Sequence, residues 1–358
     1  MNTYIIAEAG VNHNGNLKLA FQLIDVAVSS GADAVKFQIF SPVKLASASA
    51  SKAAYQKTKT DCNESQLDML KKLALSKKDH STLRAYCEEK NIEFLSSPFD
   101  LDSASFLLDD LKLTRIKIPS GEITTGPLLL HIARSHVSVI LSTGMSTLAD
   151  IENALSVLAF GYINHSDNQP TSHALLQAYC SPEGQQALRK KVILLHCTST
   201  YPAPFYSVNL RAMDTLRSAF SLSVGYSDHT QGIVVPIAAV ARGATVIEKH
   251  FTLDKSLPGP DHQASLEPNE LKDMVESIRA VERAMGNSTK VIQAEELDTK
   301  NIARKSLVAT QTIKRGELFA ENNIDTLRPG TGISAMYYWQ YIGQKATKEY
   351  KMGELIDG

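Results

Sequence analysis

Two histidines stand at the ends of two strand-like runs late in the chain. His229 lies in GYSDHT and His250 lies in EKHF, each after a mostly apolar stretch. A parallel strand that is buried on both faces should be almost entirely apolar, so an acid and an imidazole at its end indicate placed chemistry. Two imidazoles completed by water or substrate oxygens suit Mn, Fe, Co or Zn. We therefore expect His229 and His250 to bind a divalent metal.

Two lysines and several serines occupy the same kind of position. Lys36 lies in AVKFQ and Lys117 in RIKIPS. Lysine supplies a point charge and hydroxyls supply oriented donors, which suits an anion that carries carboxylate and phosphate groups. One alternative is that these lysines form structural ion pairs with Glu8 and Glu122, although buried ion pairs rarely add stability. Another is a Schiff-base lysine, which leaves the two histidines unexplained.

Other polar residues near these strand ends receive weaker expectations. Asp261 lies in the loop beyond the last run, where it could hold a metal-bound water or a substrate hydroxyl. Asp228 could orient His229 from behind. His196 ends an earlier run in the same way, and a direct role for it stays open. The histidines expected to be structural or superficial are His80, His131, His136, His165 and His173.

Alternating strand and helix patterns must position these side chains. Segments with helical spacing separate the β-rich runs, and several of them end at a glycine. Eight repeats favour a parallel (β/α)8 barrel over an open doubly wound sheet, and no G-x-G-x-x-G follows the first run. The carboxyl ends of barrel strands meet at one mouth. The predicted strands are 4–8, 34–38, 92–97, 115–120, 137–143, 192–198, 222–227 and 245–251.

The pattern changes after the last barrel helix. We expect a barrel over 1–286, a polar linker over 287–300 and a small domain of short strands and turns over 301–358. Two connections within the barrel are long. The first, 41–65, leaves the carboxyl end of a strand, where barrel sites are built. The second, 162–190, is expected to be an insertion with little structure of its own.

Composition argues against several classes of protein. Of the 358 residues, 37 are Lys or Arg and 38 are Asp or Glu, so the net charge of -1 offers no attraction to nucleic acid or a membrane surface. The longest apolar run, 233–241, is far shorter than the roughly 20 residues of a membrane span. The amino terminus lacks the basic region of a secretion signal. The cysteines have no paired spacing, so we expect reduced thiols in a cytoplasmic protein; they are Cys62, Cys87, Cys180 and Cys197.

Motifs along essentially the whole chain resemble the sialic acid synthase family, the bacterial synthases of N-acetylneuraminic, legionaminic and pseudaminic acids. They are AEAGVNHNG, AVKFQ, FLSSPFD, KIPSGE, LSTGM, LHCTSTYPAP, GYSDHT, IEKHFTLD, PGPDHQAS and RPGTGIS. The resemblance implies a (β/α)8 TIM barrel followed by a β-clip antifreeze-like (SAF) domain, in a domain-swapped homodimer. It also implies a condensation of phosphoenolpyruvate with an open-chain N-acetylated hexosamine that releases phosphate. The implied metal is Mn²⁺, with Mg²⁺ or Co²⁺ as alternatives.

The resemblance assigns roles to individual residues, motif by motif. His229 and His250 match the family's metal-binding histidines, and Lys36 and Lys117 match its phosphoenolpyruvate lysines. Arg328, in LRPG, matches an arginine that the second domain sends into the partner's barrel to meet the N-acetyl group. Phosphate-binding hydroxyls correspond to Ser97, Ser120 and Ser142. Residues at the sugar and metal site correspond to Glu8, Gln38, Glu122, Tyr201, Ser227 and Asp261.

The expected activity is N-acetylneuraminate synthesis from N-acetylmannosamine, in surface polysaccharide biosynthesis. A legionaminic acid synthase acting on 2,4-diacetamido-2,4,6-trideoxymannose is the alternative, because AEAGVNHNG and GISAM also resemble that subgroup. Among the catalytic residues, which include Glu8 and the two histidines, Glu122 is expected to handle the proton of the attacking water. Ser199 stands where some relatives carry an asparagine near the sugar, and the family's phosphate-binding asparagine has no assigned match within 57–63. A non-catalytic sugar-binding protein would leave the lysines and histidines without a purpose.

Overall fold

The computed structural model describes residues 2–47, 65–164 and 169–357. Cys62, His165 and the segment 57–63 lie outside these ranges. Contacts within the chain divide it at Gly286 into two compact units, Met1–Gly286 and Asn287–Gly358. Each unit is described by itself. In the described ranges, no helix is both long enough and apolar enough to cross a bilayer.

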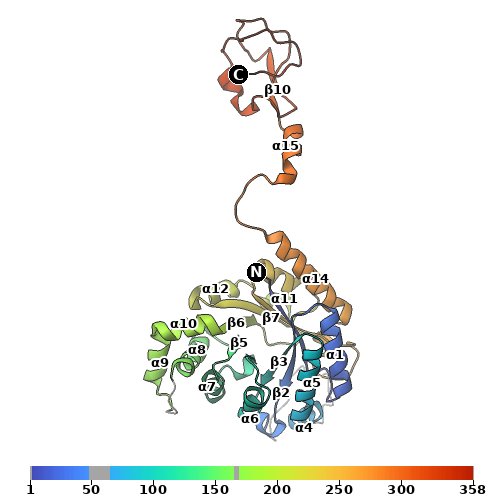
Figure 1. Ribbon diagram of the computed structural model, residues 1–358, viewed down its shortest axis with the longest axis vertical. Coiled ribbons are helices and arrows are strands. Elements are labelled where there is room, and N and C mark those ends of the chain that lie inside the picture. The colour runs from blue at the N-terminus through green and yellow to red at the C-terminus, as the bar shows by residue number, and fades with distance from the viewer. Residues whose placement is uncertain (1, 48–64, 165–168, 358) are drawn as a thin grey trace. The chain divides into compact units, whose positions relative to one another are not determined.

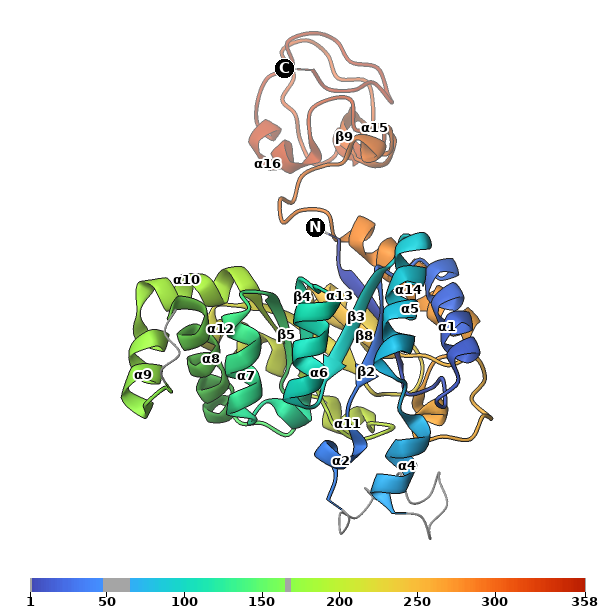
Figure 2. The same ribbon diagram turned by 60° about the horizontal axis from the view of Figure 1, so that its bottom comes forward.

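The first unit is the expected (β/α)8 barrel (Figures 1 and 2). Its strands run parallel in the order β3-β2-β1-β8-β7-β6-β5-β4, and the outermost strands, β3 and β4, contact each other and close the barrel. The strands in the described residues are β1 (Tyr4–Gly10), β2 (Ala34–Ile39), β3 (Glu93–Pro98), β4 (Arg115–Ile118), β5 (Ser138–Ser142), β6 (Val192–Cys197), β7 (Ser223–Asp228) and β8 (Val246–His250). Each matches a predicted strand, with ends that differ by a few residues.

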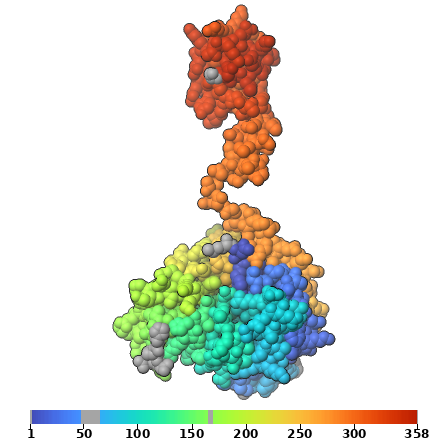
Figure 3. Space-filling view, viewed as in Figure 1, coloured from blue at the N-terminus to red at the C-terminus, as the bar shows by residue number. Residues whose placement is uncertain are grey.

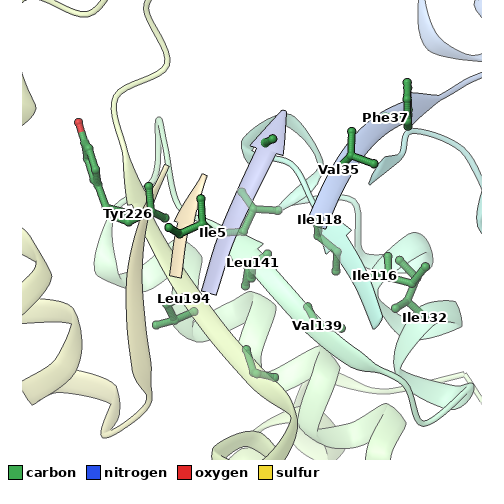
Figure 4. Close-up of a cluster of buried hydrophobic side chains, with 14 of the residues drawn as sticks. Ile5, Val35, Phe37, Ile116, Ile118, Ile132, Val139, Leu141, Leu194 and Tyr226 are labelled. Atoms are coloured by element: carbon green, nitrogen blue, oxygen red, sulfur yellow. The ribbon is translucent and has the colours of Figure 1, made fainter. Parts of the chain in front are cut away.

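Side chains alternate between the two faces of the barrel wall, as the pleat of a strand requires. On β1, Ile5 and Ala7 point outward and pack with the helices in the main core (Figure 4). Ile6 points inward and joins a separate inner apolar cluster with Leu95 and Ile140. The next inward position on β1 is Glu8. The inside of the barrel is therefore apolar near the amino ends of the strands and polar near their carboxyl ends.

Helices surround the strands and cover the outer apolar face. Several begin with a side-chain cap: Ser76 and Thr147 each form a capping box with an aspartate three residues later. The helices of this unit are α1 (Leu17–Ser29), α2 (Pro42–Leu45), α4 (Gln66–Leu73), α5 (Lys77–Glu89), α6 (Leu101–Ser105), α7 (Gly126–Arg134), α8 (Leu148–Ile163), α9 (Ser172–Cys180), α10 (Pro182–Lys191), α11 (Phe205–Val208), α12 (Ala212–Phe220), α13 (Val234–Ala241) and α14 (Pro268–Met285).

The prediction that 162–190 has little structure is wrong. Helices α9 and α10 occupy most of this segment and pack against α8. Two polar residues of this segment are helix caps: the Thr171 side chain accepts a hydrogen bond from the backbone N–H of Ala174, and that of Ser181 from the N–H of Gly184. Such caps satisfy backbone donors at a helix start, so polar residues there mark a beginning of structure.

The second unit is small and compact (Figure 3). It contains α15 (Leu297–Ala303), the antiparallel strands β9 (Ser306–Ala309) and β10 (Ile324–Leu327), and α16 (Tyr338–Tyr341). Its own core is built from Leu307, Ile313, Phe319, Ile324, Ala346, Tyr350 and Ile356. Part of the sequence expected to be a linker is helical, because α15 begins at Leu297.

Candidate functional site

A cavity of about 410 Å³, lined by both polar and apolar residues, lies among the carboxyl ends of the barrel strands. This is the end at which barrel enzymes place their chemistry. The structure brings together here all but two of the residues expected from the sequence to act in binding or catalysis. Those that line the cavity are Glu8, Lys36, Gln38, Ser97, Lys117, Ser120, Ser142, Tyr201, Ser227, His229, His250 and Asp261.

Two lysines and two carboxylates form a buried cluster at the floor of this cavity. The Lys36 Nζ atom lies 2.7 Å from Glu8 Oε2 and 3.4 Å from Glu248 Oε2. The Lys117 Nζ atom lies 3.1 Å from Glu248 Oε1. Side chains of the four residues are at most 6% exposed. The four formal charges cancel, so an incoming dianion would meet two ammonium groups that carboxylates already hold in place.

Burial and pairing act against each other on these charges. Burial favours the neutral form of Lys36, but Glu248 and Glu8 outweigh it and raise the pKa of that lysine. Burial likewise favours a protonated Glu248, but Lys117 and Lys36 hold the pKa of Glu248 well below its ordinary value. Burial dominates at Glu8, where it raises the pKa, and at Lys117, where it lowers the pKa. Glu248 is thus the anion that both lysines share.

Glu248 was recognised in the sequence as a strand-end residue but was given no role, and the lysine pairing expected as the structural alternative is present only in part. Lys36 does pair with Glu8, whereas Lys117 pairs with Glu248 rather than with Glu122. The available signal was spacing: Glu248 precedes His250 by two residues and therefore shares its face of β8. The Ser227 hydroxyl donates to Glu248 Oε1 at 2.8 Å and ties β7 to this carboxylate.

The two histidines lie side by side on neighbouring strands. Their ring centroids are 5.7 Å apart, and the Tyr201 ring packs against both, at 4.2 Å from His229 and 5.6 Å from His250. His229 Nδ1 lies 2.7 Å from the carbonyl oxygen of Thr198. Because a carbonyl only accepts, Nδ1 carries the hydrogen and Nε2 keeps its lone pair. The buried His250 Nδ1 has no hydrogen-bond partner in the described ranges.

These features fit a metal ion that takes two ligands from the protein. Burial lowers the pKa of His229 to about 4 and that of His250 well below its ordinary value, so both imidazoles are neutral, as ligands must be. Burial and the nearby Glu8 raise the pKa of Asp261 to about 7. Across 2–47, 65–164 and 169–357, no cluster of three or more His, Cys, Asp or Glu is arranged to hold an ion. Water or substrate oxygens would therefore complete the coordination.

Hydroxyl groups line the side of the cavity above the lysines. Ser97 Oγ accepts a hydrogen bond from Lys36 Nζ at 3.2 Å. The buried Ser142 Oγ has no hydrogen-bond partner among the described residues and could bind a ligand. Ser120 Oγ accepts from the backbone N–H of Gly144 at 3.0 Å. A larger residue than Gly144 would displace these hydroxyls, because a Cβ atom would lie 2.2 Å from Ser199 Oγ and 2.8 Å from Ser120 Oγ.

Apolar residues form the remaining wall of the cavity, which the sequence analysis missed. They come from the segments after β1, β2 and β3 and from α4, and they belong to one apolar cluster. The apolar lining residues of this cluster are Val11, Phe40, Leu45, Met69, Leu70, Leu73 and Phe99.

Other expected residues lie elsewhere. Glu122 does not line the cavity, and its carboxylate accepts a hydrogen bond from Thr125 Oγ1 at 2.7 Å. Arg328 belongs to the second unit, where its Nε donates to the carbonyl of Ala303. His196 points outward from β6 and donates from Nε2 to the Val208 carbonyl. Asp228, which was expected to orient His229 from behind, faces the opposite side of β7 and binds Lys249 rather than the imidazole ring.

Comparison with known proteins decides the family. The NeuB family matches residues 23–290, and the SAF domain matches residues 304–358. The chain belongs to the NeuB family. This confirms the expected sialic acid synthase family and the antifreeze-like domain, and it makes the chain an enzyme, a transferase of the nonulosonate synthase class.

Relatives match along nearly the whole chain. The N,N'-diacetyllegionaminic acid synthase of Campylobacter jejuni is 52% identical over 99% of this chain and 98% of its own length. That of Legionella pneumophila is 43% identical over 99% and 94%. The crystal structure of the N-acetylneuraminic acid synthetase of Leptospira borgpetersenii in complex with citrate is 33% identical, with a TM-score of 0.66 over 84% of this chain and 90% of that one.

Proposed function

We propose that this enzyme is an N,N'-diacetyllegionaminic acid synthase. It condenses phosphoenolpyruvate with open-chain 2,4-diacetamido-2,4,6-trideoxymannose and releases phosphate. The observation that carries the proposal is the 52% identity over 99% of the chain to a synthase of that product, against 33% for the sialic acid synthetase. The expectation of N-acetylneuraminate as the product therefore gives way to the alternative that the sequence had left open.

The lysine cluster suits the phosphoenolpyruvate end of this reaction. Lys36 and Lys117 offer ammonium groups to its carboxylate and phosphate. Ser97 and Ser120 offer hydroxyls beside them, and Ser142 offers one that no other described residue binds. Hydrogen bonds from hydroxyls to charged oxygens are stronger than those between neutral groups. Together these groups would hold the enol carbon in a fixed position at the cavity floor.

The neighbouring part of the cavity suits the acceptor aldehyde. His229 and His250 would hold a divalent ion there, with Mn²⁺ as the first candidate. When bound, such an ion supplies Lewis-acid polarisation of the aldehyde oxygen. Gln38, which donates from Nε2 to Glu8 Oε1 at 3.1 Å, and Asp261 would orient the hydroxyl and amide groups of the sugar.

Bond formation joins C3 of phosphoenolpyruvate to the aldehyde carbon and leaves positive character at C2. A preorganised carboxylate beside C2 stabilises that charge, and Glu8 is placed to provide it. Water then adds to C2, and the tetrahedral intermediate expels phosphate through C–O cleavage. The geometry favours Glu8 over Glu122 for this part of the reaction, since Glu122 does not line the cavity.

We also propose a homodimer in which the second unit of each subunit completes the barrel site of its partner. Exposed apolar side chains support it in both units. Loops after barrel strands expose Met145, Phe205 and Tyr206, and the small unit exposes Met336 and Trp339. In this dimer, Arg328 of the partner subunit would meet an N-acetyl group of the sugar. A fully active monomer in sedimentation would contradict this arrangement.

The deciding experiment is an acceptor comparison. Purified enzyme, phosphoenolpyruvate and Mn²⁺ are incubated with 2,4-diacetamido-2,4,6-trideoxymannose or with N-acetylmannosamine, and phosphate release and the product mass are measured. We expect kcat/KM at least tenfold higher with the diacetamido sugar. A preference for N-acetylmannosamine would reverse the assignment, and release that survives EDTA would remove the role of the metal.

A further inference from the structure

A buried polar cluster lies directly behind the two cavity histidines, on the outer face of β7 and β8. Asp228 and Lys249 are paired in the register of these strands. Each precedes a cavity histidine in the sequence, so each points outward where its neighbour points inward. Figure 4 shows Tyr226, two residues before Asp228, on this outer side of β7. The cluster has no part in the proposed reaction.

Both carboxylate oxygens of Asp228 are held by close contacts. The Lys249 Nζ atom lies 2.5 Å from Asp228 Oδ2, and both side chains are 0% exposed. Tyr226 donates its hydroxyl hydrogen to Asp228 Oδ1 at 3.0 Å. The Thr230 backbone N–H donates to the same oxygen at 3.0 Å, and its hydroxyl donates to Oδ2 at 3.1 Å. Lys249 Nζ also donates to the Thr230 carbonyl.

These contacts bracket one histidine and adjoin the other. Asp228 and Thr230 lie on either side of His229, and Lys249 precedes His250. The Lys249 ammonium group therefore links Asp228 and Thr230, the residues before and after His229, to the strand position next to His250. Removing two charges completely from water costs free energy that mutual attraction repays only in part. Global stability alone is consequently a poor reason for such a pair at this place.

We propose that the Asp228–Lys249 ion pair positions His229 and His250 relative to each other for metal binding. The inference rests on the proposed metal site. The pair is a positioning element that acts through the backbone of β7 and β8, and it does not touch substrate. Residues behind metal ligands typically alter metal affinity 10- to 100-fold when they are replaced.

The test is the Kd of Mn²⁺ in the absence of substrate, measured from the free-ion signal in electron paramagnetic resonance. The double variant Asp228→Asn/Lys249→Met removes both charges and keeps similar shapes, so it leaves no lone buried charge. We expect its Kd for Mn²⁺ to rise at least tenfold while circular dichroism shows a folded barrel. The matched control is Glu93→Gln/Arg115→Met, which removes the 3.0 Å ion pair at the first residues of β3 and β4, the other ends of the strands. It should leave the Kd unchanged.

A second variant guards against a double variant that fails to fold. Tyr226→Phe removes one hydrogen bond to Asp228 and keeps the ring, and we expect a smaller rise in Kd. An unchanged Kd in the folded double variant would overturn the positioning role and leave the metal site in place. If the double variant does not fold, an unchanged Kd in Tyr226→Phe would overturn the positioning role instead. The His229→Ala/His250→Ala variant, which lacks the two expected ligands, is the reference for no binding. A wild-type enzyme that binds no Mn²⁺, as this reference does, would overturn the metal site and the positioning role together. A Kd that rises equally in the control would show a general effect of losing an ion pair, and would also overturn the proposal.

Discussion

At the scale of single residues, some polar side chains of the cavity are bound by other protein side chains, whereas others are left for a ligand. Glu248 is held by Lys36, Lys117 and Ser227. Ser142 Oγ is buried and has no hydrogen-bond partner within the part of the chain that the structure describes. A buried hydroxyl without a partner costs stability, so its natural partner is a bound ligand. This contrast leads to a prediction that distinguishes binding from folding.

We expect Ser142→Ala to raise the KM for phosphoenolpyruvate roughly tenfold or more, since a hydrogen bond to a charged group is worth about 1.5–3 kcal/mol. The free energy of unfolding should not fall, because the substitution removes a buried hydroxyl that has no partner among the described residues. Ser227→Ala is the control, because it removes a hydrogen bond to Glu248 and should lower stability in urea as well. A loss of stability in Ser142→Ala, with an unchanged KM, would argue against a ligand contact.

The two carboxylates expected to act in catalysis can be compared directly. Glu8 lines the cavity and pairs with Lys36, whereas Glu122 accepts from Thr125 outside the lining. We expect Glu8→Gln to lower kcat at least 100-fold, because it removes a charge placed beside the reacting atoms. Glu122→Gln should lower kcat less than tenfold, because its charge is remote from them. Steady-state phosphate release measures both. A larger loss in Glu122→Gln would restore the original assignment of that residue.

At the scale of elements, the loops that follow β4, β5 and β6 approach one another very closely. Gly144, after β5, lies against Ser120 after β4 and Ser199 after β6. A Cβ at this position would force the Ser199 and Ser120 hydroxyls and the Cys197 thiol to move, and Ser120 lines the cavity. The requirement here is steric and concerns three different strands.

We therefore expect Gly144→Ala to displace Ser120 and to raise the KM for phosphoenolpyruvate, at a cost of about 1–3 kcal/mol in stability for the overpacking. Gly121→Ala is the matched control, because it adjoins Ser120 and a Cβ there would meet nothing within 4 Å. Kinetics and urea unfolding of both variants check the prediction. Equal effects of the two substitutions would show that the close approach does not matter.

At the scale of the whole molecule, buried neutral histidines make stability depend on pH. His13 and His80, outside the cavity, are 1% and 0% exposed. Burial lowers the pKa of His13 to about 3 and the pKa of His80 to about 4. An unfolded chain binds protons at both positions below the ordinary histidine pKa of about 6.5. The folded chain excludes those protons until the pH is much lower.

Because the unfolded state binds more protons over that range, the free energy of unfolding should fall as the pH falls from about 6.5 towards 4. Each such histidine contributes up to about 1.4 kcal/mol per pH unit. Urea unfolding in EDTA at several pH values measures the slope. His80→Leu should unfold with a shallower slope than the wild-type chain. Parallel slopes would show that His80 is protonated equally in both states.

The sequence by itself determined the order and type of the barrel elements and most of the residues at the mouth. Hydrophobic runs and helix spacing are local signals. The carboxyl ends of all strands in a parallel barrel meet at one mouth, so a residue at such an end must lie there. Polar residues such as Lys117 and His250 therefore revealed their place before any contact was known. The motifs of the family, being contiguous, were equally visible in the chain.

Only the tertiary structure decided which of these groups touch. In the structure, Lys117 pairs with Glu248 instead of Glu122, and Asp228 points away from His229 and pairs with Lys249. Glu122 lies outside the cavity. The physical reason is that pairing depends on the register between strands and on which face each residue presents, and the spacing within one strand specifies neither. Burial then fixes the charges, because the pKa of a group reflects every neighbour in space rather than its neighbours in the chain.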